Sequence, residues 1–165
     1  MADLLTLRLL DPVEDIDLYH QAFNWRTSKR HTSAPQMPFE TFTDTDPTHL
    51  TIGLFNGELL AVYFLREWEP ARYEAHFTSR KGVPRETLLW GARQVMNLVL
   101  SNGGAEICAL VLAENRPLRQ FVTELGLQRV GMMRFTSCQN DTEASSIANK
   151  RNHRDVFVKY AATRG

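Results

Sequence analysis

A two-residue turn between two apolar runs constrains the fold of this chain more than any other feature of its sequence. Asn56-Gly57 separates residues 50–55 from residues 58–68, and both segments are rich in apolar side chains. Asn and Gly accept the positive φ angles that a tight two-residue turn requires. The two segments are therefore predicted to pair as an antiparallel hairpin.

A second strand-like segment follows the hairpin. Tyr73, Ala75 and Phe77 alternate with polar residues, which is the period-two pattern of a strand. Successive side chains of a strand point to opposite faces, so Glu74 and His76 are predicted to share one face.

A basic turn and a long amphipathic helix come next. The turn is SRKGVPR at residues 79–85. The apolar residues after it recur at three- and four-residue spacing and form one stripe, and Pro84 suits the first turn of a helix. The apolar run 107–112 then reads as a buried strand. Because a crossover helix precedes it, this strand is predicted to lie parallel to the Tyr73 strand.

The remaining segments complete one α/β (α+β) domain over residues 1–165. Strands are predicted near residues 5–9, 127–135 and 156–160, and helices near residues 13–25 and 116–125. The order is β-α-β-β-β-α-β-α-β-β, which predicts a mixed, mainly antiparallel sheet flanked by helices. Polar segments at residues 26–47, with a short helix near 39–42, and at residues 137–154 are predicted loops.

Composition excludes several classes of function. Nineteen basic residues balance nineteen acidic ones, so no long-range field attracts nucleic acid or anionic membranes. No apolar run approaches the roughly 20 residues of a membrane span, and no export signal opens the chain, which favours the cytoplasm. The spacing of Cys108 and Cys138 predicts two free thiols, and the five histidines show no zinc-binding spacing. No metal is expected.

The order of elements, together with residues 114–127, resembles the GCN5-related N-acetyltransferase superfamily. In ENRPLRQFVTELGL, Asn115 follows a strand and Gly126 stands eleven places later, as in the family's segment, although Leu127 replaces its aromatic residue. The resemblance covers residues 5–160. It implies an acetyltransferase fold that moves acetyl from acetyl-CoA to an amine.

The basic turn departs from the family's Gln/Arg-x-x-Gly-x-Gly/Ala pyrophosphate turn. With Gly82 in the first glycine place, Ser79 replaces Gln/Arg and Pro84 replaces the second glycine, removing one N–H donor. Cationic side chains in the turn offset this loss, since lysine and arginine bind phosphate directly. The cofactor-binding residues that the resemblance implies are Phe77, Thr78, Arg80, Lys81, Gly82, Val83, Arg85 and Asn115. Asn115 is also suited to cap the helix that follows, and that role is favoured.

Glu74 and His76 are the candidate catalytic residues. The resemblance puts their strand beside the thioester, and either group could remove a proton from the acceptor ammonium. The alternative is that they form only the polar face of a half-exposed strand. The tyrosine that many members use as general acid is Val122 here, and four tyrosines elsewhere remain as replacements: Tyr19, Tyr63, Tyr73 and Tyr160.

Three functions follow from these residues. The first is acetyl transfer from acetyl-CoA to an unidentified amine by direct attack. The second is a non-catalytic interaction or virion-associated module that kept the fold, in line with a resemblance to bacteriophage members of the superfamily. The third is modification of a nucleobase amine, with contacts from residues 149–154, although those residues are favoured as a solvated loop. The oligomeric state stays open, a homodimer included.

Overall fold

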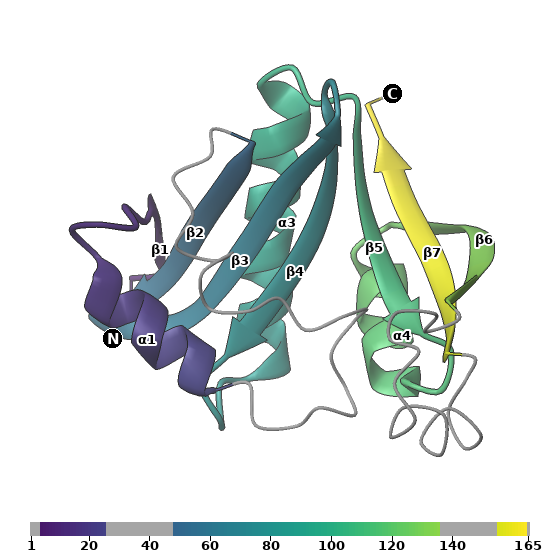
Figure 1. Ribbon diagram of the computed structural model, residues 1–165. Coiled ribbons are helices and arrows are strands. Elements are labelled where there is room, and N and C mark those ends of the chain that lie inside the picture. The colour runs from purple at the N-terminus through teal and green to yellow at the C-terminus, as the bar shows by residue number, and fades with distance from the viewer. Residues whose placement is uncertain (1–3, 26–47, 136–154, 165) are drawn as a thin grey trace, which may run out of the picture.

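The computed structural model describes residues 4–25, 48–135 and 155–164. In these residues the chain forms one mixed sheet with the strand order β1-β2-β3-β4-β5-β7-β6 (Figure 1). The elements along the chain are β1 (Thr6–Leu9), α1 (Ile16–Asn24), β2 (His49–Asn56), β3 (Glu58–Glu69), β4 (Arg72–Ser79), α3 (Arg85–Ser101), β5 (Glu106–Leu112), α4 (Arg116–Glu124), β6 (Gln128–Phe135) and β7 (Asp155–Thr163). The predicted order of elements and the mixed, mainly antiparallel sheet are confirmed.

The hairpin forms where the sequence predicts it. The turn itself is tighter than the predicted two-residue turn, because Asn56 still belongs to β2 and pairs with Glu58 on β3. Of the two predicted turn residues, Gly57 alone has a positive φ, of 68°. Only glycine adopts such an angle at little cost, which explains its place in the turn. Residues 59–65 of β3 are all buried, because helices cover both faces of the sheet at this strand.

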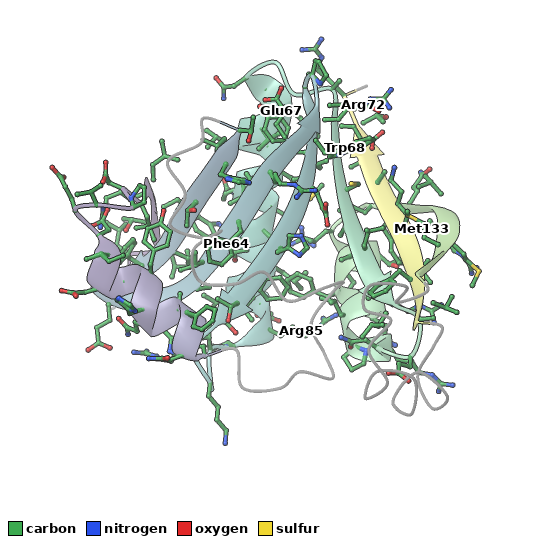
Figure 2. All side chains as sticks on the ribbon, viewed as in Figure 1. Phe64, Glu67, Trp68, Arg72, Arg85 and Met133 are labelled. Atoms are coloured by element: carbon green, nitrogen blue, oxygen red, sulfur yellow. The ribbon has the colours of Figure 1, made fainter. Side chains whose placement is uncertain are left out.

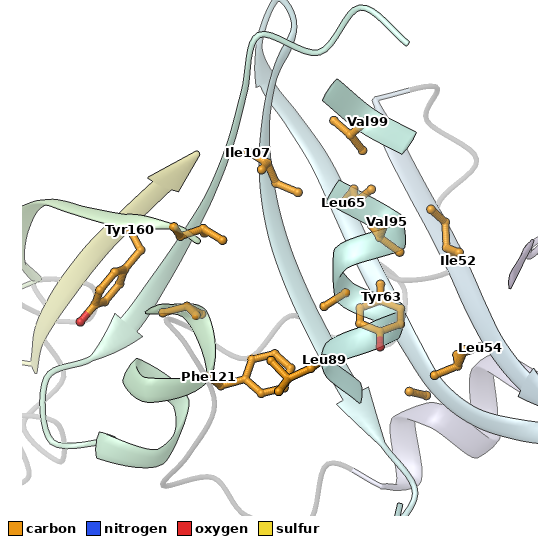
Figure 3. Packing of buried hydrophobic residues seen from close by; sticks show 14 of the residues in the cluster. Ile52, Leu54, Tyr63, Leu65, Leu89, Val95, Val99, Ile107, Phe121 and Tyr160 are labelled. Carbon is orange, nitrogen blue, oxygen red and sulfur yellow. The ribbon is translucent and has the colours of Figure 1, made fainter. Parts of the chain in front are cut away.

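Two apolar clusters lie on the two faces of the sheet. The larger packs α3 and α4 against it and includes Tyr63, Leu89, Ile107 and Phe121 (Figure 3). The smaller packs α1 against the other face of β3, through Val62 and Phe64 among others. We refer to these as the α3 face and the α1 face of the sheet.

Helix α3 packs its predicted apolar stripe against β3. Leu89, Ala92, Val95 and Val99 are buried on this helix. Gly91, which is not part of the apolar stripe, is buried as well. It lies so close to the sheet that a Cβ at this position would overlap the hydroxyl of Tyr63. The glycine thus lets the helix approach the sheet closely.

Two details at the N-terminus differ from the predicted pattern. Leu5, Leu7 and Leu9 alternate with polar residues, which predicts one buried face for the first strand, but Leu9 is 59% exposed and Leu10 is buried instead. Helical spacing from Val13 onward predicts that Val13 lies on the apolar face of the first helix, but it is 73% exposed, because α1 begins only at Ile16. The helix packs on the sheet through Tyr19 and Ala22.

Strands β4 and β5 are parallel, as predicted, but they pair over a short distance. Their register runs from Arg72 opposite Glu106 to Glu74 opposite Cys108 and then stops. Both strands continue, β4 to Ser79 and β5 to Leu112, and Figure 1 shows them diverging toward their C-terminal ends. The sheet is therefore open between its two central strands.

Several predictions fall outside the described residues. The short helix near 39–42, Cys138 and residues 149–154 are among them. No helix in the described part of the chain is long and apolar enough to cross a membrane.

Candidate active site at the divergence of β4 and β5

Glu74 and His76 lie together on the α1 face of β4. His76 Nε2 is 2.9 Å from Glu74 Oε1, and both side chains are mostly buried. Arg66 on β3 stands opposite Glu74 in the register, and its guanidinium lies 3.7 Å from Glu74 Oε2. The hydrogen bond from His76 lowers the pKa of Glu74 against the opposing effect of burial, with smaller contributions from the charges of His76, Arg66 and Lys159. Glu74 is therefore a carboxylate at neutral pH.

The backbone edges of β4 and β5 face each other without a described strand between them. Beyond Glu74 and Cys108 no register joins the two strands. On their outer edges, β4 pairs with β3 as far as Ser79, and β5 pairs with β7 as far as Leu112. Unpaired N–H and C=O groups along a strand edge are a template for another extended chain. This open stretch can accept a ligand that carries amide groups.

Aromatic side chains cover the α3 face of the opening. Phe77 on β4 stacks on Phe121 of α4 with ring centroids 5.1 Å apart, and Tyr63 stacks on Phe77 at 6.0 Å. Figure 3 shows Phe121 beside Leu89 of α3, among the buried residues. Glu74 and His76 lie on the opposite face. A ligand between the strands would thus rest against apolar rings on one side and meet the Glu74–His76 pair on the other.

The basic turn leads from β4 into α3 at the open end of the two strands. Gly82 has a φ of 91°, and Pro84 is the N-cap of α3 without a side-chain cap hydrogen bond. The first N–H groups of a helix have no partner within it, and its N-terminus favours anions. Lys81 is exposed, whereas Thr78 and Val83 are half-buried. These features suit a phosphate-bearing group.

Two arginines of the turn are paired with carboxylates. Arg80 Nη1 donates to Glu58 Oε2 at 2.6 Å, and Arg85 Nη1 donates to Glu124 Oε2 at 2.7 Å. The second bond raises the pKa of Arg85 and lowers that of Glu124. Because these pairs are exposed, they are weak and open to exchange with another anion. Figure 2 shows Arg85 near the open end of β4.

Asn115 caps α4, as the sequence favours. Its Oδ1 accepts a hydrogen bond from Leu118 N at 3.2 Å, and the side chain is buried. The next turn of the helix holds Arg119, which donates to Tyr160 Oη and to Ala113 O. Asn115 thus positions the helix beside the opening.

None of the four tyrosines stands in the position of the family's acid. Val122 occupies that position and is buried in the core. The hydroxyl of Tyr63 donates to Leu88 O at 2.9 Å, and burial raises its pKa. Tyr19 donates to Leu10 O and Tyr73 to Glu67 Oε2. Tyr160 accepts from Arg119.

The sequence did not place beside Glu74 four residues that the structure gathers around it on the α1 face. They come from three strands: Trp68 from β3, Glu106 and Cys108 from β5, and Lys159 from β7. Alternation along residues 106–112 predicts that Glu106 and Cys108 share a face, but only the strand order brings them beside Glu74. Burial raises the pKa of the Cys108 thiol to about 11, with the charges of Glu74 and Glu106 also raising it. Among the described residues, no group of three His, Cys, Asp or Glu side chains could hold a metal ion.

The fold is shared with many solved acetyltransferase structures. An N-acetyltransferase from Staphylococcus aureus Mu50 superimposes with a TM-score of 0.74 at 11% identity, covering 98% of each chain. The ribosomal-protein-S18-alanine N-acetyltransferase from Escherichia coli gives a TM-score of 0.68 at 15% identity, covering 98% of this chain and 95% of that one. A spermidine N-acetyltransferase mutant from Vibrio cholerae gives 0.69 at 12%, covering 97% and 94%.

The chain matches known proteins by structure and not by sequence. No protein-family model matches the chain, and no curated protein matches it by sequence. The structural matches span nearly the whole chain at low identity. The chain has the fold of the GCN5-related N-acetyltransferases, which bears out the resemblance seen in its sequence.

Proposed function

We propose that this protein transfers an acetyl group from acetyl-CoA to a primary amine by direct attack. The observation that carries the proposal is the pair of open backbone edges on β4 and β5, with an ionised carboxylate beside them. The pantetheine arm of CoA is extended and contains two amide groups, so it can pair with such edges as an added strand does. Its thioester would then lie near Glu74 and His76.

The basic turn would hold the CoA diphosphate. The N-terminus of α3 supplies partial positive charge, and the neighbouring Lys81 and Arg85 supply full charges. The missing N–H of Pro84 removes one donor from this cradle. Arg80 and Arg85 would exchange their carboxylate partners for phosphate oxygens. Phe77 and Thr78 would contact the arm of the cofactor from β4.

The Glu74–His76 pair would accept the proton that the acceptor ammonium must lose. A positioned base of this kind contributes about 10²–10⁴-fold to a rate. The pair acts as a unit, because the 2.9 Å hydrogen bond couples the two groups. Cys108 is a poor alternative nucleophile, since a thiol with a pKa of about 11 carries little thiolate at neutral pH. Direct transfer is therefore favoured over an acyl-cysteine intermediate.

A second candidate is a non-catalytic module that retains the fold. The specific observation in its favour is the pairing of Arg80 with Glu58 and of Arg85 with Glu124, which occupies two of the cations in the turn. Together with the missing N–H of Pro84, these pairs are what a turn that no longer binds phosphate would show. A fold can persist after its chemistry is lost.

Cofactor binding separates the two candidates. The melting temperature of the full chain is measured with increasing acetyl-CoA. A ligand at a hundred times its Kd stabilises the folded state by about 2.7 kcal/mol, so a clear rise in melting temperature is expected. An unchanged melting temperature at millimolar acetyl-CoA would eliminate the enzyme and leave the non-catalytic module.

Turnover then tests the Glu74–His76 pair. Release of CoA thiol is followed with a panel of primary amines, and Glu74→Gln is expected to lower the rate about a hundredfold or more, without loss of acetyl-CoA binding. Glu69→Gln is the matched control, because Glu69 is an exposed carboxylate that pairs with Arg72 at the far end of β3. Equal rates in both variants would remove the pair from the mechanism.

A further inference from the structure

A lysine amine is held on the α1 face of the sheet, in the cluster that surrounds Glu74. Lys159 Nζ lies 3.6 Å from Glu106 Oε1 and 5.1 Å from the centre of the Trp68 ring. A carboxylate and the face of a tryptophan both attract an ammonium group. Figure 2 shows Trp68 near the closed end of the β4–β5 pair. The Lys159 side chain is 27% exposed, so it is oriented without being sealed off.

The strand registers place the backbone of Lys159 just beyond the start of the divergence, and its amine reaches back toward Glu106. Glu74 stands opposite Cys108, and two residues further along β5, Leu110 stands opposite Lys159. Paired residues and residues two apart share a face, so Lys159 lies on the face of Glu74 and His76. The positive charge of Lys159 contributes to the low pKa of Glu74, and it also acts on Cys108, which agrees with this placement.

Lys159 meets the chemical requirements of an acetyl acceptor. It is a primary amine, it is oriented by two fixed groups, and it shares a face with the pair proposed to accept protons. Holding a reacting group in place removes much of the entropic cost of bringing it to the thioester. Lys81, the other lysine in the described residues, is also a primary amine, but it lies exposed in the basic turn and no carboxylate or ring within the described residues orients it.

We propose that Lys159 is a self-acetylation site of this protein, modified by acetyl-CoA bound between β4 and β5. The inference rests on the proposed function. The Lys159 ammonium loses one proton to the Glu74–His76 pair, and its Nζ then attacks the thioester carbonyl carbon. The C–N bond forms, the C–S bond breaks, and sulfur leaves with the electron pair. The second proton of nitrogen goes to the thiolate, so the products are acetyl-lysine and CoA thiol.

Acetylation would alter the site that performs it. Amide formation removes the charge on Nζ that faces Glu106 and the Trp68 ring. Glu106 Oε1 is buried and, within the described residues, accepts no hydrogen bond, so its carboxylate would lose the cation beside it. Losing the partner of a buried charge is costly. Modification at Lys159 would therefore change the neighbourhood of Glu74 after the first turnovers.

The test follows acetylation of the purified full chain over time. Protein is incubated with acetyl-CoA, and the mass gained and the modified residue are determined by intact-mass and peptide mass spectrometry. Lys159 is expected to gain one acetyl group at least about tenfold faster than Lys81, although Lys81 is the more exposed. Glu74→Gln is expected to slow modification of Lys159 about a hundredfold and to leave Lys81 unaffected.

Three results would overturn the inference. One is modification of Lys81 at or above the rate of Lys159, and another is modification of Lys159 at the same rate in Glu74→Gln. The third is a mass gain on intact Lys159→Arg equal to that of the wild type, since arginine keeps the charge but is not acetylated. If acetyl-CoA still binds, none of these three results contradicts the proposed function. Failure of acetyl-CoA to raise the melting temperature would instead remove the proposed function itself.

Discussion

The two edges of β4 are joined to the rest of the sheet in different ways. On one edge, β4 pairs with β3 from Arg72 to Ser79, so that backbone hydrogen bonds run the length of the strand. On the other edge, its pairing with β5 ends at Glu74. The comparison shows that the β3–β4 half is fixed by its backbone, whereas beyond Glu74 the approach of β5 to β4 depends on side chains.

Those side chains differ between the two faces. On the α3 face, the stacked rings of Phe77 and Phe121 connect β4 to α4, and α4 packs beside β5. On the α1 face the groups are polar, with Glu74, His76 and Lys159 among them. Parallel pairing is slightly less stable per residue than antiparallel pairing, and the Phe77–Phe121 stack joins β4 to α4 rather than to β5. An opening with one apolar and one polar wall results.

Breaking the contact between Phe77 and Phe121 is expected to have the largest effect, a loss of stability. Phe121→Ala should lower the free energy of unfolding by about 3–5 kcal/mol, because it removes a buried ring and leaves a cavity. Combined with Phe77→Ala in a double-mutant cycle, it should show a coupling of about 0.5–1.5 kcal/mol. Urea unfolding measures both quantities.

The elements in which amide exchange accelerates distinguish the two edges of β4. In Phe121→Ala, amide exchange should accelerate in β5 and α4 more than in β3. Leu65→Ala is the matched control, because Leu65 is fully buried on β3, and there the order should reverse. Uniform acceleration in both variants would show that the two halves of the sheet open together.

An intermediate effect on stability is expected at acid pH, through Glu74 on the polar α1 face of the opening. The folded-state pKa of Glu74 lies below its ordinary value of 4.5, so its contribution to stability is present above that value and is lost as pH falls through the folded-state pKa. His76→Ala removes the main cause of the shift and leaves the effect of burial, which raises the pKa. The acid-induced loss of stability should therefore begin at higher pH in this variant.

Unfolding free energies above and below pH 4.5 provide the measurement. Arg66→Gln is the comparison variant, because the charge of Arg66 is a lesser cause of the shift. Its acid profile should lie between those of the wild type and His76→Ala. Superimposable profiles for all three proteins would contradict the hydrogen bond as the source of the low pKa.

The smallest effect is expected at the open end of the strands. Glu124→Gln removes the carboxylate that pairs with Arg85 and frees that arginine for phosphate. Exposed ion pairs are weak, so the affinity for acetyl-CoA should rise only about threefold, as measured by calorimetry. Glu86→Gln is the control, an exposed carboxylate in the first turn of α3 with no ion pair in the described residues. Weaker binding in Glu124→Gln would show that Arg85 does not face the cofactor.

Local patterns were enough to predict most of the elements. The hairpin around Gly57, the alternation around Glu74 and the stripe of α3 all depend on neighbours within a few residues along the chain, and all three are confirmed. The patterns were wrong for Leu9, the last residue of the edge strand β1, and for Val13, which precedes α1, because local periodicity does not fix where an element ends. The cytoplasmic location and the bacteriophage origin remain predictions from the sequence.

The candidate site was predicted only in part. Glu74 and His76 are two residues apart on one strand, so their shared face follows from the strand period. Trp68, Glu106 and Lys159 are separated from Glu74 by strands and crossovers, and no local pattern connects them. The ion pairs of Arg80 and Arg85 were also missed, because their partners Glu58 and Glu124 lie in other elements.

Local sequence patterns predicted the order of the strands and helices along the chain, the hairpin, and the shared strand face of a glutamate and a histidine. These depend on backbone preferences and on the period of apolar residues, which are short-range properties. The divergence of β4 and β5 after Glu74 and the position of Lys159 on the face of Glu74 follow from the arrangement of the strands in space, and no local pattern predicts them. Both depend on which strands become neighbours, and that is decided by contacts between segments far apart in the chain.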